Sequence, residues 1–75
     1  MERIRFECVI PEQNKRAFYE LISRRDLFGF VLIRCFGRIG ARGRALKTRF
    51  TNSDEMLAER ERLKKIRLGR GYIRV

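Results

Sequence analysis

The sequence predicts an α+β domain, a small antiparallel β-sheet of four or five strands with one C-terminal helix packed on one face. Two observations lead to this prediction. Apolar residues alternate or run together in four short segments between residues 3 and 50, as in strands, and recur at helical spacing after residue 52. Short turns join the four segments, and strands with short connections pair antiparallel. With 75 residues, the chain is expected to form a single domain, residues 1–75, around a small core.

The first three strands are expected at Arg3–Ile10, Ala17–Ser23 and Phe30–Phe36. Alternation in the first strand puts Ile4, Phe6 and Cys8 on one face. The third strand begins with apolar residues on both faces, which indicates a central position in the sheet. Its side chains divide between two faces, one with Arg34, Phe36 and Arg38 and the other with Val31, Ile33 and Cys35. We expect the face without cations to meet the core.

The fourth strand is expected at Ala45–Phe50 and the helix directly after Asn52. Asn is a typical N-cap residue, and a glutamate, Glu55, follows at the third helical position. Three apolar residues fall on one side of this helix and are expected to pack on the sheet: Met56, Leu63 and Ile66. A glycine, Gly69 or Gly71, is expected to end the helix, after which the last four residues can return as a short strand.

The charge of the chain is strongly positive and unevenly placed. The chain has 19 Lys and Arg against 9 Asp and Glu, a net charge of +10. No acid lies between residues 34 and 50, where the cations are Arg34, Arg38, Arg42, Arg44, Lys47 and Arg49. A positive field of this size attracts polyanions, namely DNA, RNA or an anionic membrane surface.

The same segment contains three glycines, Gly37, Gly40 and Gly43, and their spacing admits several interpretations. A Walker-type phosphate loop is excluded, because no Lys with Ser or Thr follows the last glycine and the next element is a strand. The GxxG clamp of KH-type RNA binders fits the letters at 37–40, but that clamp joins two helices. The flanking strands favour an irregular hairpin loop in which at least one glycine has a positive φ.

A hairpin loop alone does not explain the six cations. Phe36 lies between Arg34 and Arg38 on one strand face, an arrangement that suits contact with a sugar or base and with the phosphates on either side. The alternative is that Phe36 turns into the core while the arginines keep the hairpin soluble. Both interpretations remain open at this point.

Other classes of function lack support in the sequence. Histidine and the CxxC spacing are absent, so we expect no metal site and no cofactor, and the two cysteines, Cys8 and Cys35, are expected to be reduced and buried. No nucleophile is paired with a base, so no catalytic residue and no enzyme activity are expected. No signal-type or membrane-spanning apolar run is present, which predicts a cytoplasmic protein that does not cross a membrane.

Four motifs, in register along nearly the whole chain, resemble the WGR domain family. The family's Trp-Gly-Arg signature, usually continued by Ile-Gly, corresponds to Phe36–Gly40. Its Phe-Tyr strand corresponds to Phe18–Leu21, its Lys-rich strand ending in Phe to Lys47 and Phe50, and its closing motif to Lys65 and Gly71-Tyr72. This chain departs from the pattern at Phe36, where the family has Trp, and at Cys35, where it has Arg; two residues, Arg16-Ala17, also separate Asn14-Lys15 from the Phe-Tyr strand.

The resemblance implies a non-enzymatic nucleic-acid-binding module, with DNA favoured over RNA. In strand-break-sensing poly(ADP-ribose) polymerases, the similar module packs its Trp and signature Arg near a DNA end. The candidate nucleic-acid-binding residues of this chain are Arg34, Phe36, Gly37, Arg38, Gly40, Arg42, Arg44, Lys47 and Arg49. The alternative is a protein-interaction module that docks an acidic partner through the same surface.

Overall fold

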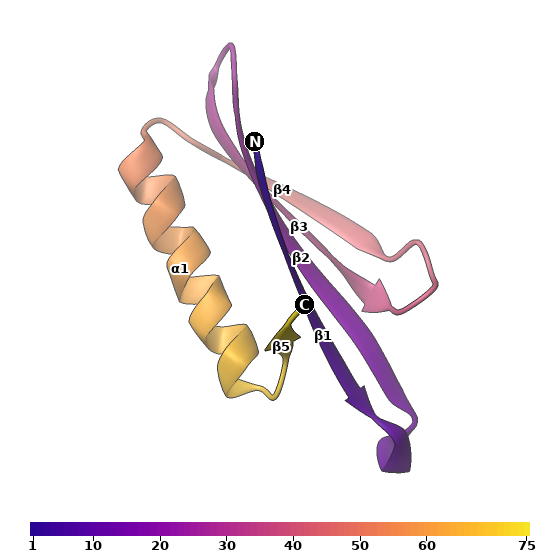
Figure 1. Ribbon diagram of the computed structural model, residues 1–75. Helices are drawn as coiled ribbons and strands as arrows, with labels where there is room; N and C mark the ends of the chain where they lie inside the picture. The colour runs from indigo at the N-terminus through magenta and orange to yellow at the C-terminus, as the bar shows by residue number, and fades with distance from the viewer.

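The fold is a single twisted sheet covered on one face by one helix (Figure 1). The computed structural model describes residues 1–75, which form β1 (Glu2–Ile10), the 3₁₀ turn η1 (Pro11–Gln13), β2 (Lys15–Asp26), β3 (Gly29–Arg38), β4 (Arg44–Phe50), α1 (Ser53–Gly69) and β5 (Ile73–Arg74). All strand pairs are antiparallel, in the order β4-β3-β2-β1-β5. The predicted fold class is therefore confirmed, with five strands.

The hairpin of β2 and β3 is longer than the sequence indicates. Pairing between the two strands continues from Ala17↔Arg38 to Asp26↔Gly29, whereas β1 stops pairing with β2 at Glu2↔Ser23. The end of this hairpin therefore extends past β1, as the narrow arm at the top of Figure 1. The second strand is expected from the sequence to end at Ser23, with a turn over residues 24–29, but Arg24–Asp26 still belong to β2.

The core lies between the sheet and α1. It consists of apolar side chains from three strands and the helix: Ile4, Phe6, Tyr19, Leu21, Leu32, Met56 and Leu63. The expected inner side of the helix is confirmed for Met56 and Leu63, while Ile66 is half-buried. The Asn52 N-cap is also confirmed, because its side-chain oxygen accepts a hydrogen bond of 2.8 Å from the Glu55 amide. With 17 residues, α1 is neither long nor apolar enough to cross a membrane.

The expected orientation of β3 is wrong, although Val31 on the opposite face is itself fully buried. Leu32 belongs to the core and Phe36 packs against it, so the face with Arg34, Phe36 and Arg38 is the one that α1 covers. The run Phe30–Ile33 is apolar at every position, so alternation within it carries no information about the core side. The orientation instead follows from pairing with β2, since Phe36 lies opposite the core residue Tyr19. Cys35 is consequently half-buried on the uncovered face, whereas Cys8 is buried as expected.

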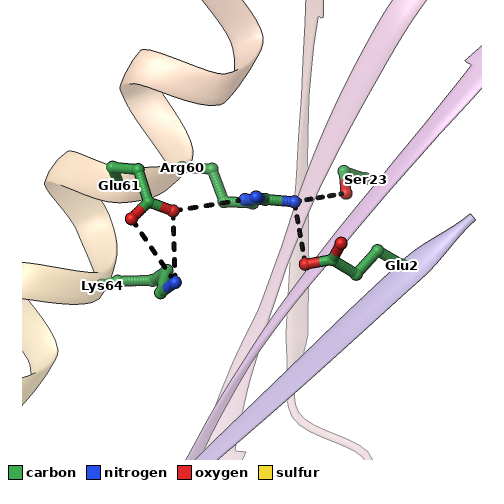
Figure 2. Close-up of polar contacts among 5 residues, drawn as sticks. All are labelled: Glu2, Ser23, Arg60, Glu61 and Lys64. Carbon is green, nitrogen blue, oxygen red and sulfur yellow. Dashed lines mark hydrogen bonds and ion pairs between the residues drawn. The ribbon is translucent and has the colours of Figure 1, made fainter.

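Arg60 connects the middle of α1 to the sheet (Figure 2). Its side chain is 16% exposed, and Nη1 donates to Glu2 Oε1 at 2.8 Å and to the hydroxyl of Ser23 at 3.5 Å. On the helix, Glu61 lies 3.6 Å from Arg60 Nε and also pairs with Lys64 at 3.1 Å. Ser23 is the one buried polar residue of the chain, and Arg60 supplies its partner.

Candidate nucleic-acid interface

The glycine-rich segment forms the β3–β4 hairpin, with a connecting loop at residues 39–43. Gly40 and Gly43 have φ angles of 91° and 78°, which L-residues rarely adopt. The prediction that at least one glycine of this segment has a positive φ is therefore confirmed. Gly37 lies within β3, where its φ is not positive, so conformational freedom does not explain it.

Close packing explains why position 37 is a glycine, and at position 43 it is a second reason for glycine beside the positive φ. A Cβ atom at Gly37 would lie 2.8 Å from the Cα of Gly43. A Cβ atom at Gly43 would lie 2.6 Å from the carbonyl oxygen of Phe36 and 2.7 Å from Cζ of Phe18. The two glycines thus let the end of β3 and the start of β4 approach each other beside the buried ring of Phe18.

On the helix side of the sheet, next to this hairpin, lies an aromatic pocket of about 340 Å³. Its wall residues include Tyr19, Arg34, Phe36, Leu63, Arg67 and Tyr72. The half-buried ring of Phe36 stacks on Tyr19, with 6.0 Å between the ring centroids and 19° between the planes. The strand aromatics are therefore brought together with the end of α1 and with Tyr72, which comes shortly after the helix ends.

Two cations lie against the aromatic rings of this pocket. The guanidinium carbon of Arg67 is 4.3 Å from the Tyr19 ring centroid and 5.3 Å from that of Tyr72, and Lys15 Nζ is 5.6 Å from the latter. Arg67 Nε and the Tyr19 hydroxyl are buried and have no hydrogen-bond partner within the protein. Unpaired buried polar groups of this kind are costly, so both are candidates to bind a polar ligand atom.

A second, polar hollow of about 420 Å³ adjoins the aromatic pocket and shares Ala17 and Gly37 with it. Its remaining walls come from residues 13–16 and Arg38. The guanidinium of Arg38 donates to the backbone carbonyl of Asn14 at 3.2 Å and to its side-chain oxygen at 3.3 Å. Lys15, Arg16 and Arg38 thus place three cations around a hollow that no acidic side chain lines.

The structure brings together some of the predicted site residues and separates others. Arg34, Phe36, Arg38 and Arg44 share the helix-side face, with Arg44 directly opposite Phe36. Arg34 also acts on α1, where the pKa of Glu59 is lowered mainly by its hydrogen bond from Arg62 and in part by the charge of Arg34. Gly40 and Arg42 lie exposed in the loop.

Lys47 and Arg49 point instead to the uncovered face of the sheet, because they occupy the alternate positions of β4. Arg49 lies near the far end of β3, where it is paired with Asp26 at 2.6 Å. The pocket also contains four residues that were not among the candidates predicted from the sequence: Tyr19, Leu63, Arg67 and Tyr72. The closing Gly71-Tyr72 motif was the available signal for Tyr72, whereas Arg67 is indistinguishable in the sequence from any cation in a last helical turn.

Comparison with known proteins identifies the family. No curated protein and no solved structure matches the chain. The family model of the WGR domain matches residues 2–75. WGR domains are nucleic-acid-binding modules and not catalysts, in agreement with an aromatic pocket surrounded by cations. The chain therefore belongs to the WGR domain family along essentially all of its sequence.

Proposed function

We propose that this protein binds DNA, and preferentially DNA ends, through the β3–β4 hairpin and the aromatic pocket beside it. The observation that carries the proposal is the placement of Phe36 in a pocket bordered by Arg34 and Arg67, with Arg38 and Arg44 on the same face. Aromatic rings bind the face of a base or sugar, and guanidiniums bind phosphate. The geometry thus supports a nucleotide at Phe36 and backbone phosphates on the surrounding cations.

The size of the pocket favours an end or an unpaired nucleotide over the middle of a duplex. At about 340 Å³, it lies at the lower end of the range for small-molecule sites. One nucleoside fits such a volume, whereas a stacked base pair does not expose a base face to it. The cations of the loop and the adjoining polar hollow lie outside the pocket, where continuous phosphate backbone can reach them.

Salt dependence tests the electrostatic part of the proposal. If three to five phosphates of a duplex are neutralised, the logarithm of the association constant should fall against the logarithm of salt concentration with a slope of about −3 to −4.5. Replacing Arg42 or Arg44 by Ala should flatten that slope by about one unit and weaken binding to all sequences alike. Fluorescence anisotropy with a labelled duplex at several salt concentrations measures both quantities.

Arg3→Ala is the matched control, because Arg3 is an exposed cation on β1, which β2 separates from the β3–β4 hairpin. The salt slope of Arg3→Ala should stay closer to that of the unchanged protein than the slopes of the Arg42 and Arg44 variants do. No binding to DNA at low salt would refute the proposal. Reversal of the charges of Arg38, Arg42 and Arg44 without loss of binding would refute the assignment of the interface, and docking of an acidic protein would then be the function of this surface.

Phe36→Ala should act differently from the charge variants. We expect the affinity for blunt linear duplex and for single strands to fall by about 1–3 kcal/mol, with the salt slope nearly unchanged, because stacking releases no counterions. A closed circular duplex has no ends, and its affinity should change little. Comparing duplexes with and without a 5′-phosphate measures the preference for the phosphate. Comparing DNA with an RNA duplex of the same sequence measures the preference for DNA.

Because Phe36 also stacks on Tyr19, its removal affects packing as well. Circular dichroism and the unfolding midpoint must therefore be measured first, and Phe36→Leu serves as a second variant that keeps apolar volume but removes the ring. Equal losses on linear and circular DNA for a folded variant would contradict a role in binding ends.

A further inference from the structure

The tip of the β2–β3 hairpin carries two apolar side chains that nothing in the chain covers. Leu27 and Phe28 are 95% and 79% exposed, more than any other large apolar residue except Met1 at the terminus. They lie at the far end of β3 from the glycine-rich loop, on the arm that extends past β1. Because these side chains remain in solvent, they bury almost no apolar surface within the fold, and a contact outside the chain can account for them.

Several contacts brace the turn at the tip. Asp26 Oδ1 accepts a hydrogen bond of 2.9 Å from the Phe28 amide, and both Asp26 oxygens accept from Arg49 Nη1 at 2.7 and 2.6 Å. The Arg49 guanidinium also lies 5.8 Å from the Phe28 ring centroid. At Gly29 the backbone has a φ of 136° and passes so close to Phe50 that a Cβ would lie 2.6 Å from its carbonyl oxygen. The two apolar side chains are thus displayed on a defined turn.

Cations connect this tip to the proposed interface. Arg24 and Arg25 precede the tip in β2, and cations follow along β4 on both of its faces. Arg49, which pairs with Asp26, and Lys47 lie on the uncovered face, and Arg44 lies on the helix-side face. The strand β4 is the outer strand of the sheet, and no acid occurs from residue 34 to residue 50. Cations on both faces of an edge strand suit a linear polyanion that lies along the edge, whereas a flat membrane surface at the tip would leave most of these cations unused.

We propose that the tip of the β2–β3 hairpin inserts Phe28 and Leu27 at a base step of the DNA that the β3–β4 hairpin binds. The inference rests on the proposed function and adds a second, separate contact to it. Proteins that kink DNA insert apolar side chains such as Phe and Leu between base steps and unstack them in this way. The tip acts here as a wedge, and the cationic edge of β4 holds the backbone between wedge and pocket.

The length of β3 predicts where the wedge enters. Phe28 and Phe36 are eight residues apart along an extended strand, which corresponds to about 26 Å at 3.3 Å per residue. This distance equals about eight base pairs at 3.4 Å per pair. A duplex whose end occupies the pocket at Phe36 should therefore be unstacked roughly seven to nine base pairs from that end.

The test uses blunt duplexes longer than the 44 Å protein, each with 2-aminopurine at a different position. At saturation, the fluorescence of this base should rise at one step in the expected window, because unstacking relieves its quenching. The double variant Leu27→Ser/Phe28→Ser should abolish the rise and weaken binding about 5- to 30-fold, with the salt slope unchanged. The control, Leu57→Ser on α1, should keep both the rise and the affinity.

The possible results separate the wedge from the proposed function. DNA binding without a tip-dependent rise overturns the wedge and leaves the DNA-binding function standing. A complete lack of DNA binding by the unchanged protein overturns both. Binding to vesicles of phosphatidylserine and phosphatidylcholine that is lost in the double variant, together with no fluorescence change on DNA, would assign the tip to a membrane surface and overturn the wedge.

Discussion

Leu63→Ala should lower the free energy of unfolding by about 2–4 kcal/mol. Leu63 is 4% exposed and joins α1 to the core residues of the sheet. The loss combines the transfer free energy of the removed methyl groups with the cost of the cavity that remains. A domain of this size has a total stability of only about 3–5 kcal/mol, so a large share of the variant molecules should be unfolded.

Urea denaturation followed by circular dichroism measures this loss. Leu68→Ala is the matched control, because Leu68 lies on the same helix but is 54% exposed, and its replacement should change stability by less than about 0.5 kcal/mol. A loss below about 0.5 kcal/mol for Leu63→Ala would mean that α1 does not hold the core together. Leu63 also lines the aromatic pocket, so any remaining folded Leu63→Ala should bind DNA ends more weakly.

Gly43→Ala should be more damaging than Gly40→Ala, although both glycines lie in the same loop and both have a positive φ. At Gly40 a Cβ would meet nothing within 4 Å, so the cost is backbone strain alone, about 1–2 kcal/mol. At Gly43 the same strain is joined by contacts of 2.6 Å with the Phe36 carbonyl and 2.7 Å with the Phe18 ring. Forced overpacking of this kind adds about 1–3 kcal/mol.

Gly40→Ala carries the cost of backbone strain without the close contacts, so it is the control for strain. The difference between the two variants therefore measures the cost of close packing at Gly43. Unfolding midpoints in urea give the two stability changes, and DNA affinity reports on the hairpin itself. We expect Gly43→Ala to weaken DNA binding in the molecules that stay folded, because relief of the clash must move the end of β3, where Phe36 lies. Equal stability losses in the two variants would show that the approach of Gly43 to Phe36 and Phe18 is not tight in solution.

Elements whose signal is local could be predicted from the sequence alone. Alternation placed β1 with Ile4 and Phe6 inward, and helical spacing placed Met56 and Leu63 on the inner side of α1. The Asn52 cap and the positive φ angles of the hairpin loop also follow from residues adjacent in the chain. In each case the determining interactions lie within a few residues, and side-chain chemistry and backbone periodicity describe them fully.

The membership of the candidate site depended on tertiary structure. Because β3 is apolar on both faces where it begins, only its pairing with β2 and the position of α1 decide that Phe36 faces the helix. The pocket then acquires Arg67 and Tyr72 from the far end of the chain, which no local pattern connects to β3. The period of two in β4 separates Lys47 and Arg49 from Arg44, although all three belong to one unbroken basic segment. The sequence alone thus indicates from the basic segment that the partner is negatively charged. Which of these cations share one surface depends on the tertiary structure, because the helix covers only one face of the sheet.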